Sequence, residues 1–246
     1  MKKINQLLRE WPRGAVLTIR YLKTKQITAH HLKQYRKSGW IENVGRGAYR
    51  LKDDIIDWQG IVYGLQQEKN VHVGGKTALQ LKGFTHFIPS KLETIFLYSD
   101  TVKTLPPWVN EIEWGGSFVF TYLRLFNQQF EDSFSWYRHN EFSIKISAPE
   151  RAILEMLYHV PQKQSFDEAM KIMESLSTLR PQVIQKLLES CNSIKVKRLF
   201  LYMAEIQQHF WLTHLDISHI NLGRGKRQII RDGKLDKKYL ITVPGD

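Results

Sequence analysis

A segment of 34 residues, 18–51, constrains the fold of this chain more than any other part of its sequence. Thr18 and Thr28 each precede a short helical stretch, and a threonine at this position accepts hydrogen bonds from otherwise unpaired backbone N–H groups. Gly39 suits the left-handed position that ends a helix. A glycine-rich hairpin pattern follows directly. Two short helices, a tight turn and a hairpin predict a winged helix-turn-helix, which places its second helix in the DNA major groove.

The second predicted helix has one apolar edge and one polar face. At about 100° per residue, Leu32 and Tyr35 project to the same edge, which we expect to be buried. The opposite face carries side chains that can form hydrogen bonds and no carboxylate: His30, Lys33, Gln34 and Lys37. Phosphates and base edges require such a face, whereas an ordinary solvated face normally mixes charges of both signs. We therefore predict that this face contacts DNA.

The predicted hairpin supplies the wing. Its first strand begins at Trp40 and Ile41, residues 43–47 form the turn, and residues 48–51 return. Arg46 lies at the tip, where an arginine can reach the minor groove or a phosphate. An ordinary solvent-exposed polar residue at a hairpin tip would give the same sequence pattern. The wing therefore supports DNA binding only because it directly follows the predicted recognition helix. The predicted DNA contacts are Thr28, His30, His31, Lys33, Gln34, Arg36, Lys37 and Arg46.

The positive charge of the chain is unevenly distributed. The formal net charge is +12, with +11 in residues 1–52, −3 in residues 53–222 and +4 in residues 223–246. A polyanion would therefore be attracted mainly to the N-terminal part. We predict a winged-helix domain over residues 1–52 and a C-terminal domain over residues 53–246, which together give an α+β fold.

Within the C-terminal domain, the pattern changes along the chain. Residues 93–147 read mostly as strands, residues 148–210 mostly as helices, and residues 223–246 form a basic tail. Ser147 with Glu150 three residues later predicts a capping box at the first of these helices. Cys191 continues an apolar helical stripe, so we expect it to be buried and unreactive.

Two basic segments are candidate contacts for an anion or a partner. Residues 74–77, which include Lys76, resemble a phosphate loop, but position 70 is Asn where that motif requires glycine, so a tight turn is the favoured interpretation. In the tail, glycines on both sides of Arg224 would let the backbone approach an anion. Lys226 and Arg227 follow. A basic surface loop before a terminal strand over residues 239–243 explains the tail equally well.

The sequence predicts no catalytic residue, metal site or cofactor. Glu111 and Glu113 are expected to share one face of a strand, but a nuclease would also need a lysine where position 115 is Gly. The histidines, at 72, 86, 139, 159, 209, 214 and 219 outside the helix above, form no HExxH pattern, and Cys191 is the single cysteine. No apolar run is long enough to span a membrane and no signal peptide follows Met1, so a cytoplasmic protein is expected.

Five blocks, taken in order, resemble the AbiEi family of antitoxins from type IV toxin–antitoxin systems, which are linked to abortive phage infection. They are GWIENVGRGAYRL (39–51), GGKTALQLKGF (74–84), ISAPERAILEML (146–157), VKRLFLYMAE (196–205) and GRGKR (223–227). The resemblance implies an N-terminal domain that represses its own operon by binding promoter repeats. It also implies a C-terminal domain that counters a toxin resembling a nucleotidyltransferase, without forming a stable complex with it.

Two other functions remain open from the residues alone. The chain could be a nucleic-acid-processing enzyme whose C-terminal domain carries the chemistry. It could also be a ligand-sensing transcriptional regulator whose C-terminal domain binds a small effector, with Lys76 and Lys226 as the places to look.

Overall fold

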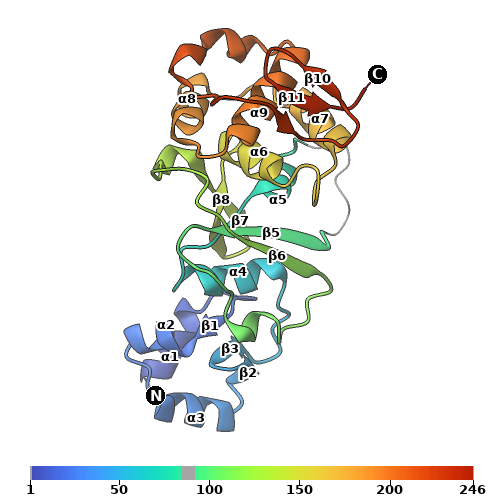
Figure 1. The fold of residues 1–246 in the computed structure, drawn as a ribbon. Coiled ribbons are helices and arrows are strands. Elements are labelled where there is room, and N and C mark those ends of the chain that lie inside the picture. Colours follow the sequence, from blue (N-terminus) through green and yellow to red (C-terminus); the bar gives the residue numbers. More distant parts are fainter. Residues whose placement is uncertain (1, 85–91, 246) are drawn as a thin grey trace. The chain divides into compact units, whose positions relative to one another are not determined.

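The computed structural model describes residues 2–84 and 92–245, and its fold is α+β, as the sequence predicted (Figure 1). The chain divides into two compact units, each assembled from separate segments. Unit 1 comprises Met1–Val73, Leu92–Tyr122 and Trp136–Lys145. Unit 2 comprises Gly74–Lys91, Leu123–Ser135 and Ile146–Asp246.

The first part of unit 1 contains two short helices, a tight turn and a hairpin, in the predicted order. Its β1, β3 and β2 strands form an antiparallel sheet in that spatial order. Leu22, Leu32 and Ile41 belong to the core beneath the helices and are each at most 2% exposed. The elements are α1 (Lys2–Glu10), β1 (Leu17–Thr18), α2 (Ile19–Thr24), α3 (Ala29–Lys37), β2 (Ile41–Gly45) and β3 (Ala48–Leu51), at the blue end of the ribbon in Figure 1.

The strands predicted between residues 93 and 147 are present and join a mixed sheet. In the described residues its order is β6-β5-β4-β8-β7, with β5 parallel to β6 and antiparallel to β4. The elements are β4 (His72–Val73), β5 (Thr94–Ser99), the 3-10 helix η1 (Pro107–Val109), β6 (Ser117–Tyr122), β7 (Phe134–His139) and β8 (Phe142–Ser147).

Helix α4 (Trp58–Gln66) packs directly on the backbone that precedes β1. A Cβ on Gly60 would lie 1.9 Å from the Gly14 carbonyl oxygen, and one on Gly64 would lie 2.5 Å from that of Val16. The Val16 N–H donates to the Gly60 carbonyl oxygen at 3.1 Å. Only glycine permits this approach, so these two positions fix α4 against the N-terminal elements of unit 1.

Unit 2 is mainly helical, and α6 and α9 contribute much of its buried core. A small sheet of order β10-β11-β9 completes it. Its elements are α5 (Gly75–Leu81), η2 (Glu131–Ser133), α6 (Pro149–Tyr158), α7 (Phe166–Ser175), α8 (Pro181–Ser190), α9 (Ile194–Ile206), η3 (Phe210–His214), η4 (Ile217–His219), β9 (Arg227–Gln228), β10 (Lys234–Asp236) and β11 (Ile241–Val243).

The capping box predicted at the start of α6 is wrong. Ala148 is the N-cap and makes no side-chain cap bond, whereas the Ser147 hydroxyl donates to Glu155 Oε2 at 2.7 Å. The Glu150 carboxylate is nearly inaccessible and accepts from the backbone N–H, Nε and Nη2 of Arg180, at 2.8–2.9 Å. A buried carboxylate requires a charged partner, and this requirement overrides the local capping preference.

The expectation for Cys191 is confirmed. Its side chain is buried, and burial raises the pKa of the thiol to about 11. Because the thiolate is the nucleophile, a thiol with this pKa is unreactive at neutral pH.

A buried carboxylate connects three elements of unit 2. Glu155, which is 1% exposed, accepts from the Gly75 N–H of α5 at 3.1 Å, the Ser147 hydroxyl of β8 at 2.7 Å and Arg151 Nε at 2.7 Å. The Arg151 guanidinium lies 4.7 Å and 4.4 Å from the ring centroids of Phe126 and Phe134. The cation of this ion pair therefore also contacts two aromatic rings.

We expect Glu155→Gln to lower the free energy of unfolding by about 3 kcal/mol, because it leaves the buried Arg151 charge without its partner. Urea denaturation of the full chain measures this. Glu174→Gln removes an exposed carboxylate from α7 and serves as the matched control, with an expected change below about 0.5 kcal/mol. Equal stabilities of the two variants would contradict the role assigned to Glu155.

Candidate nucleic-acid interface

Helix α3 begins with a reciprocal cap. The Thr28 hydroxyl accepts from the His31 N–H at 3.3 Å, and His31 Nδ1 accepts from the Thr28 N–H at 3.2 Å. The His31 ring also stacks on Tyr35, with centroids 6.0 Å apart and planes 10° apart. Sequence projection placed His31 on the flank of the DNA face. The structure gives its Nδ1 a capping role, which leaves Nε2 as the ring nitrogen able to reach a ligand.

The rotation of α3 agrees with the predicted projection. Leu32 is 1% exposed and Tyr35 is 9% exposed, and both belong to the core of the N-terminal elements. The predicted outward residues are all exposed: His30, Lys33, Gln34 and Lys37. Thr28 and Arg36 are exposed as well. The hydrophobic edge and the hydrogen-bonding face are therefore on the sides of the helix where the sequence put them.

A groove separates α3 from the first strand of the hairpin. Its volume is about 550 Å³, and it is lined by Lys33, Arg36, Lys37, Ile41, Glu42 and Asn43. Glu42 brings a carboxylate to this groove, but Arg50 of β3 donates to it twice, from Nε at 3.0 Å and Nη2 at 2.8 Å. The ion pair neutralises this acid, so the groove keeps the positive charge of α3.

The turn at the hairpin tip is shorter than the predicted turn over residues 43–47, because β2 extends to Gly45 and β3 starts at Ala48. Arg46 is exposed there. Its backbone N–H donates to Glu111 Oε2 at 2.9 Å, and a Cβ on Gly45 would lie 2.9 Å from Trp108 Cβ. The segment around η1 therefore packs on the hairpin tip and holds it in place within unit 1.

The expectation that Glu111 and Glu113 share a strand face is wrong. Both lie in irregular structure between η1 and β6, and the Glu111 carboxylate binds the wing backbone. A contact 65 residues apart in sequence gives no local signal. Only the folded chain shows that this acid belongs to the hairpin tip.

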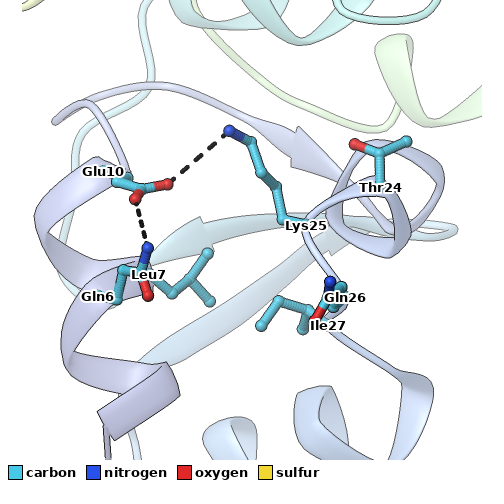
Figure 2. A pocket seen from close by; sticks show the side chains of 7 residues that line it. All are labelled: Gln6, Leu7, Glu10, Thr24, Lys25, Gln26 and Ile27. Atoms are coloured by element: carbon cyan, nitrogen blue, oxygen red, sulfur yellow. Dashed lines mark hydrogen bonds and ion pairs between the residues drawn. The ribbon is translucent and has the colours of Figure 1, made fainter.

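A smaller hollow lies between α1 and the turn after α2, and Figure 2 shows its seven lining residues. Glu10 accepts from Gln6 Nε2 at 2.9 Å and pairs with Lys25 Nζ at 3.8 Å. Gln26 adopts a positive φ of 59° in the tight turn between α2 and α3. An acid thus balances Lys25, in contrast to the lysines on the outward face of α3. The hollow is lined by Gln6, Leu7, Glu10, Thr24, Lys25, Gln26 and Ile27.

The remaining predicted contacts lie in unit 2. Lys76 Nζ is 2.5 Å from Glu168 Oε1, and the Gly75 N–H donates to Glu155, so carboxylates occupy the groups that a phosphate loop would offer. Arg224, Lys226 and Arg227 are exposed.

For metals, the described residues hold no group of three or more His, Cys, Asp or Glu side chains that could bind an ion. His86 lies outside the described residues. Within those same ranges, no helix has the length and apolar character needed to cross a bilayer.

Comparisons with known proteins cover almost the whole chain. Residues 1–90 match the family model described as "Transcriptional regulator, AbiEi antitoxin N-terminal domain". Residues 92–244 match the model described as "Transcriptional regulator, AbiEi antitoxin, Type IV TA system". None of the curated proteins matches the chain.

One solved structure, described as RV2827C protein from Mycobacterium tuberculosis, is similar with a TM-score of 0.56. Its sequence identity is 13%, and the match covers 97% of this chain and 88% of that one. At this identity the similarity shows a shared fold and nothing more.

The reciprocal cap on α3 predicts different stabilities for two substitutions at position 31. His31→Ala removes the acceptor for the Thr28 N–H, and we expect it to lower the free energy of unfolding by about 1 kcal/mol. His31→Glu restores an acceptor at the same helix position and should stay near the wild-type value. Urea denaturation distinguishes them, with His30→Ala as the exposed neighbouring control. If Ala and Glu at position 31 destabilised the protein equally, the cap would be unimportant.

Proposed function

Because this chain belongs to the AbiEi family of transcriptional regulators, antitoxins of type IV toxin–antitoxin systems, we propose a role for each of its parts. The winged helix, residues 18–51, binds promoter DNA and represses the operon that encodes the protein. The C-terminal domain, residues 53–246, counters a toxin resembling a nucleotidyltransferase. The two proteins are not expected to form a stable complex.

The observation that carries the DNA-binding proposal is the outward face of α3. Its exposed side chains are donors or cations, and residues 29–37 contain no acid. Backbone phosphates require such cations, and base edges require hydrogen-bonding groups such as Gln34. The adjacent groove supports the proposal, since Arg50 neutralises the carboxylate of Glu42.

The wing supports a second contact beside the helix. Arg46 extends from a hairpin tip whose backbone is fixed by Glu111 and Trp108, so its side chain starts from a defined place. A fixed wing loses less conformational entropy on binding than a mobile one. Together with α3, it would neutralise several phosphates and make the affinity strongly dependent on salt.

Changing Lys33, Lys37 and Arg46 together to Ala tests the surface. We expect affinity for the DNA upstream of the gene to fall roughly a hundredfold, and the slope of log K against log salt to become shallower by about three. Fluorescence anisotropy at several salt concentrations measures both. The matched control changes Lys163, Lys171 and Arg231 to Ala, which removes equal charge from exposed positions of unit 2. Similar losses in both triple variants would show that net charge, and not this surface, governs binding.

Repression and antitoxicity should separate genetically. We expect the Lys33, Lys37 and Arg46 triple variant to lose repression of a promoter–reporter fusion while still restoring growth to cells that express the toxin of its operon. The physical reason is that these side chains are exposed, and substitutions at exposed positions change stability little, so we expect the variant to fold. Growth assays with the protein supplied from an unrelated promoter measure antitoxicity alone. Loss of rescue at equal protein levels would contradict the assignment.

A further inference from the structure

Unit 2 contains a buried guanidinium that pairs with no carboxylate of the described residues. Arg198 of α9 is 2% exposed, and every acceptor that the described residues offer it is a backbone carbonyl oxygen. Burial, and then the nearby Arg227, lowers its pKa. The acceptors belong to Leu222 at 2.8 Å, Gly223 at 3.1 Å, Gly225 at 2.6 Å and Leu240 at 3.3 Å. Carbonyl dipoles hold this charge in place but do not neutralise it.

These bonds orient the loop formed by residues 222–227. In a trans peptide the N–H points opposite to the preceding carbonyl, so carbonyls of Gly223 and Gly225 turned toward Arg198 direct the N–H groups of Arg224 and Lys226 away from it. Neither N–H donates to any described residue. Gly223 and Gly225 have φ of +64° and +74°, and this left-handed geometry on alternate residues favours glycine and is typical of anion-binding backbone.

The side chains of the same loop add positive charge. Arg224, Lys226 and Arg227 are exposed, and none pairs with a described carboxylate. The Arg227 guanidinium stays beside the loop, because Nη1 donates to the Lys226 carbonyl oxygen at 3.1 Å and lies 3.9 Å from where a Cβ of Gly225 would be. Two outward N–H groups and three cations are therefore gathered on six residues.

The start of α9 contributes to the same potential. A Cβ on Gly223 would lie 3.1 Å from the Ile194 side chain, so the loop lies against the first residue of this 13-residue helix. The N-terminus of a helix carries a partial positive charge of about half a unit. This partial charge adds a smaller contribution to the positive potential that the exposed cations of the loop create.

We propose that the loop of residues 222–227 binds the phosphates of a phosphoanhydride, such as pyrophosphate or the triphosphate of a nucleotide. A single phosphate group carries about −1.5 to −2 charges at pH 7, so three exposed cations match a chain of two or three phosphates better than one. This site is separate from the winged helix and does not depend on the function proposed above.

Calorimetric titration of the full chain with pyrophosphate, GTP and ATP at constant ionic strength tests the proposal. We expect wild type to bind pyrophosphate, and the double variant Arg224→Ala with Lys226→Ala to bind it at least about tenfold more weakly, because charge-assisted hydrogen bonds are lost. The control double variant, Lys163→Ala with Lys171→Ala, removes the same charge from exposed positions and should bind like wild type.

The probes also identify the source of the phosphates. Tighter binding of GTP or ATP than of pyrophosphate would assign the site to a nucleotide, and equal binding would assign it to the phosphate chain alone. Absence of pyrophosphate binding by wild type, or equal weakening in both double variants, would overturn the proposal.

A DNA-binding measurement separates this inference from the function proposed above. We expect the Arg224 and Lys226 double variant to bind the upstream DNA within about twofold of its control. If the variant lost DNA affinity but kept its affinity for pyrophosphate, the loop would belong to a polynucleotide surface and the inference would be wrong. Failure of wild type to bind the upstream DNA would refute the DNA-binding proposal and leave this one standing.

Discussion

Burial of Leu32 and Tyr35 determines what α3 can present to a ligand. Removing a leucine or an aromatic ring from water stabilises the fold by about 1.5–3 kcal/mol each. A rotation of the helix by one residue, about 100°, would expose both and bury charged neighbours such as Lys33 or Arg36. The hydrophobic effect therefore fixes the rotation, and the reciprocal cap between Thr28 and His31 fixes where the helix begins. The charged face is a consequence of these two constraints.

Two buried charges of unit 2 are stabilised in different ways. Glu155 is paired with Arg151 and accepts further bonds from α5 and β8, so its charge is compensated and the pair serves to join elements. Arg198 is surrounded by carbonyl oxygens, so its charge is solvated by dipoles and still acts on its surroundings. The first arrangement stabilises the fold, whereas the second organises a surface loop and leaves a positive potential there.

Local signals were sufficient for much of the fold. The Thr28 cap, the rotation of α3, the strands after residue 93 and the helical content of residues 148–210 follow from periodicity and turn residues, which act over a few positions. The capping box predicted from Ser147 and Glu150 was wrong because tertiary packing decides the partners of both residues. Ser147 bonds to Glu155, and Glu150 pairs with Arg180.

In the candidate interface, too, the residues placed by local sequence could be predicted, whereas those placed by contacts distant in sequence could not. Its helical residues could be predicted from the 3.6-residue period, and their contact with DNA stays a prediction. The capping role of His31 was predictable from its position three residues after Thr28, where a side-chain acceptor can complete a capping box. The carboxylate of Glu111 at the wing and the four carbonyls around Arg198 had none, since residues distant in sequence supply them.

The segmented make-up of unit 1 limits how this protein can be dissected. The polypeptide leaves unit 1 after Val73, returns at Leu92, leaves again after Tyr122 and returns once more at Trp136. A fragment ending at residue 73 would retain α3 and the hairpin but would lack Trp108 and Glu111, which pack against them. Its hairpin tip would lose its support, so weak DNA affinity of such a fragment would be ambiguous. Cutting the chain at one position therefore cannot yield two intact units. A fusion protein that uses the N-terminal part would also have to include residues 92–122.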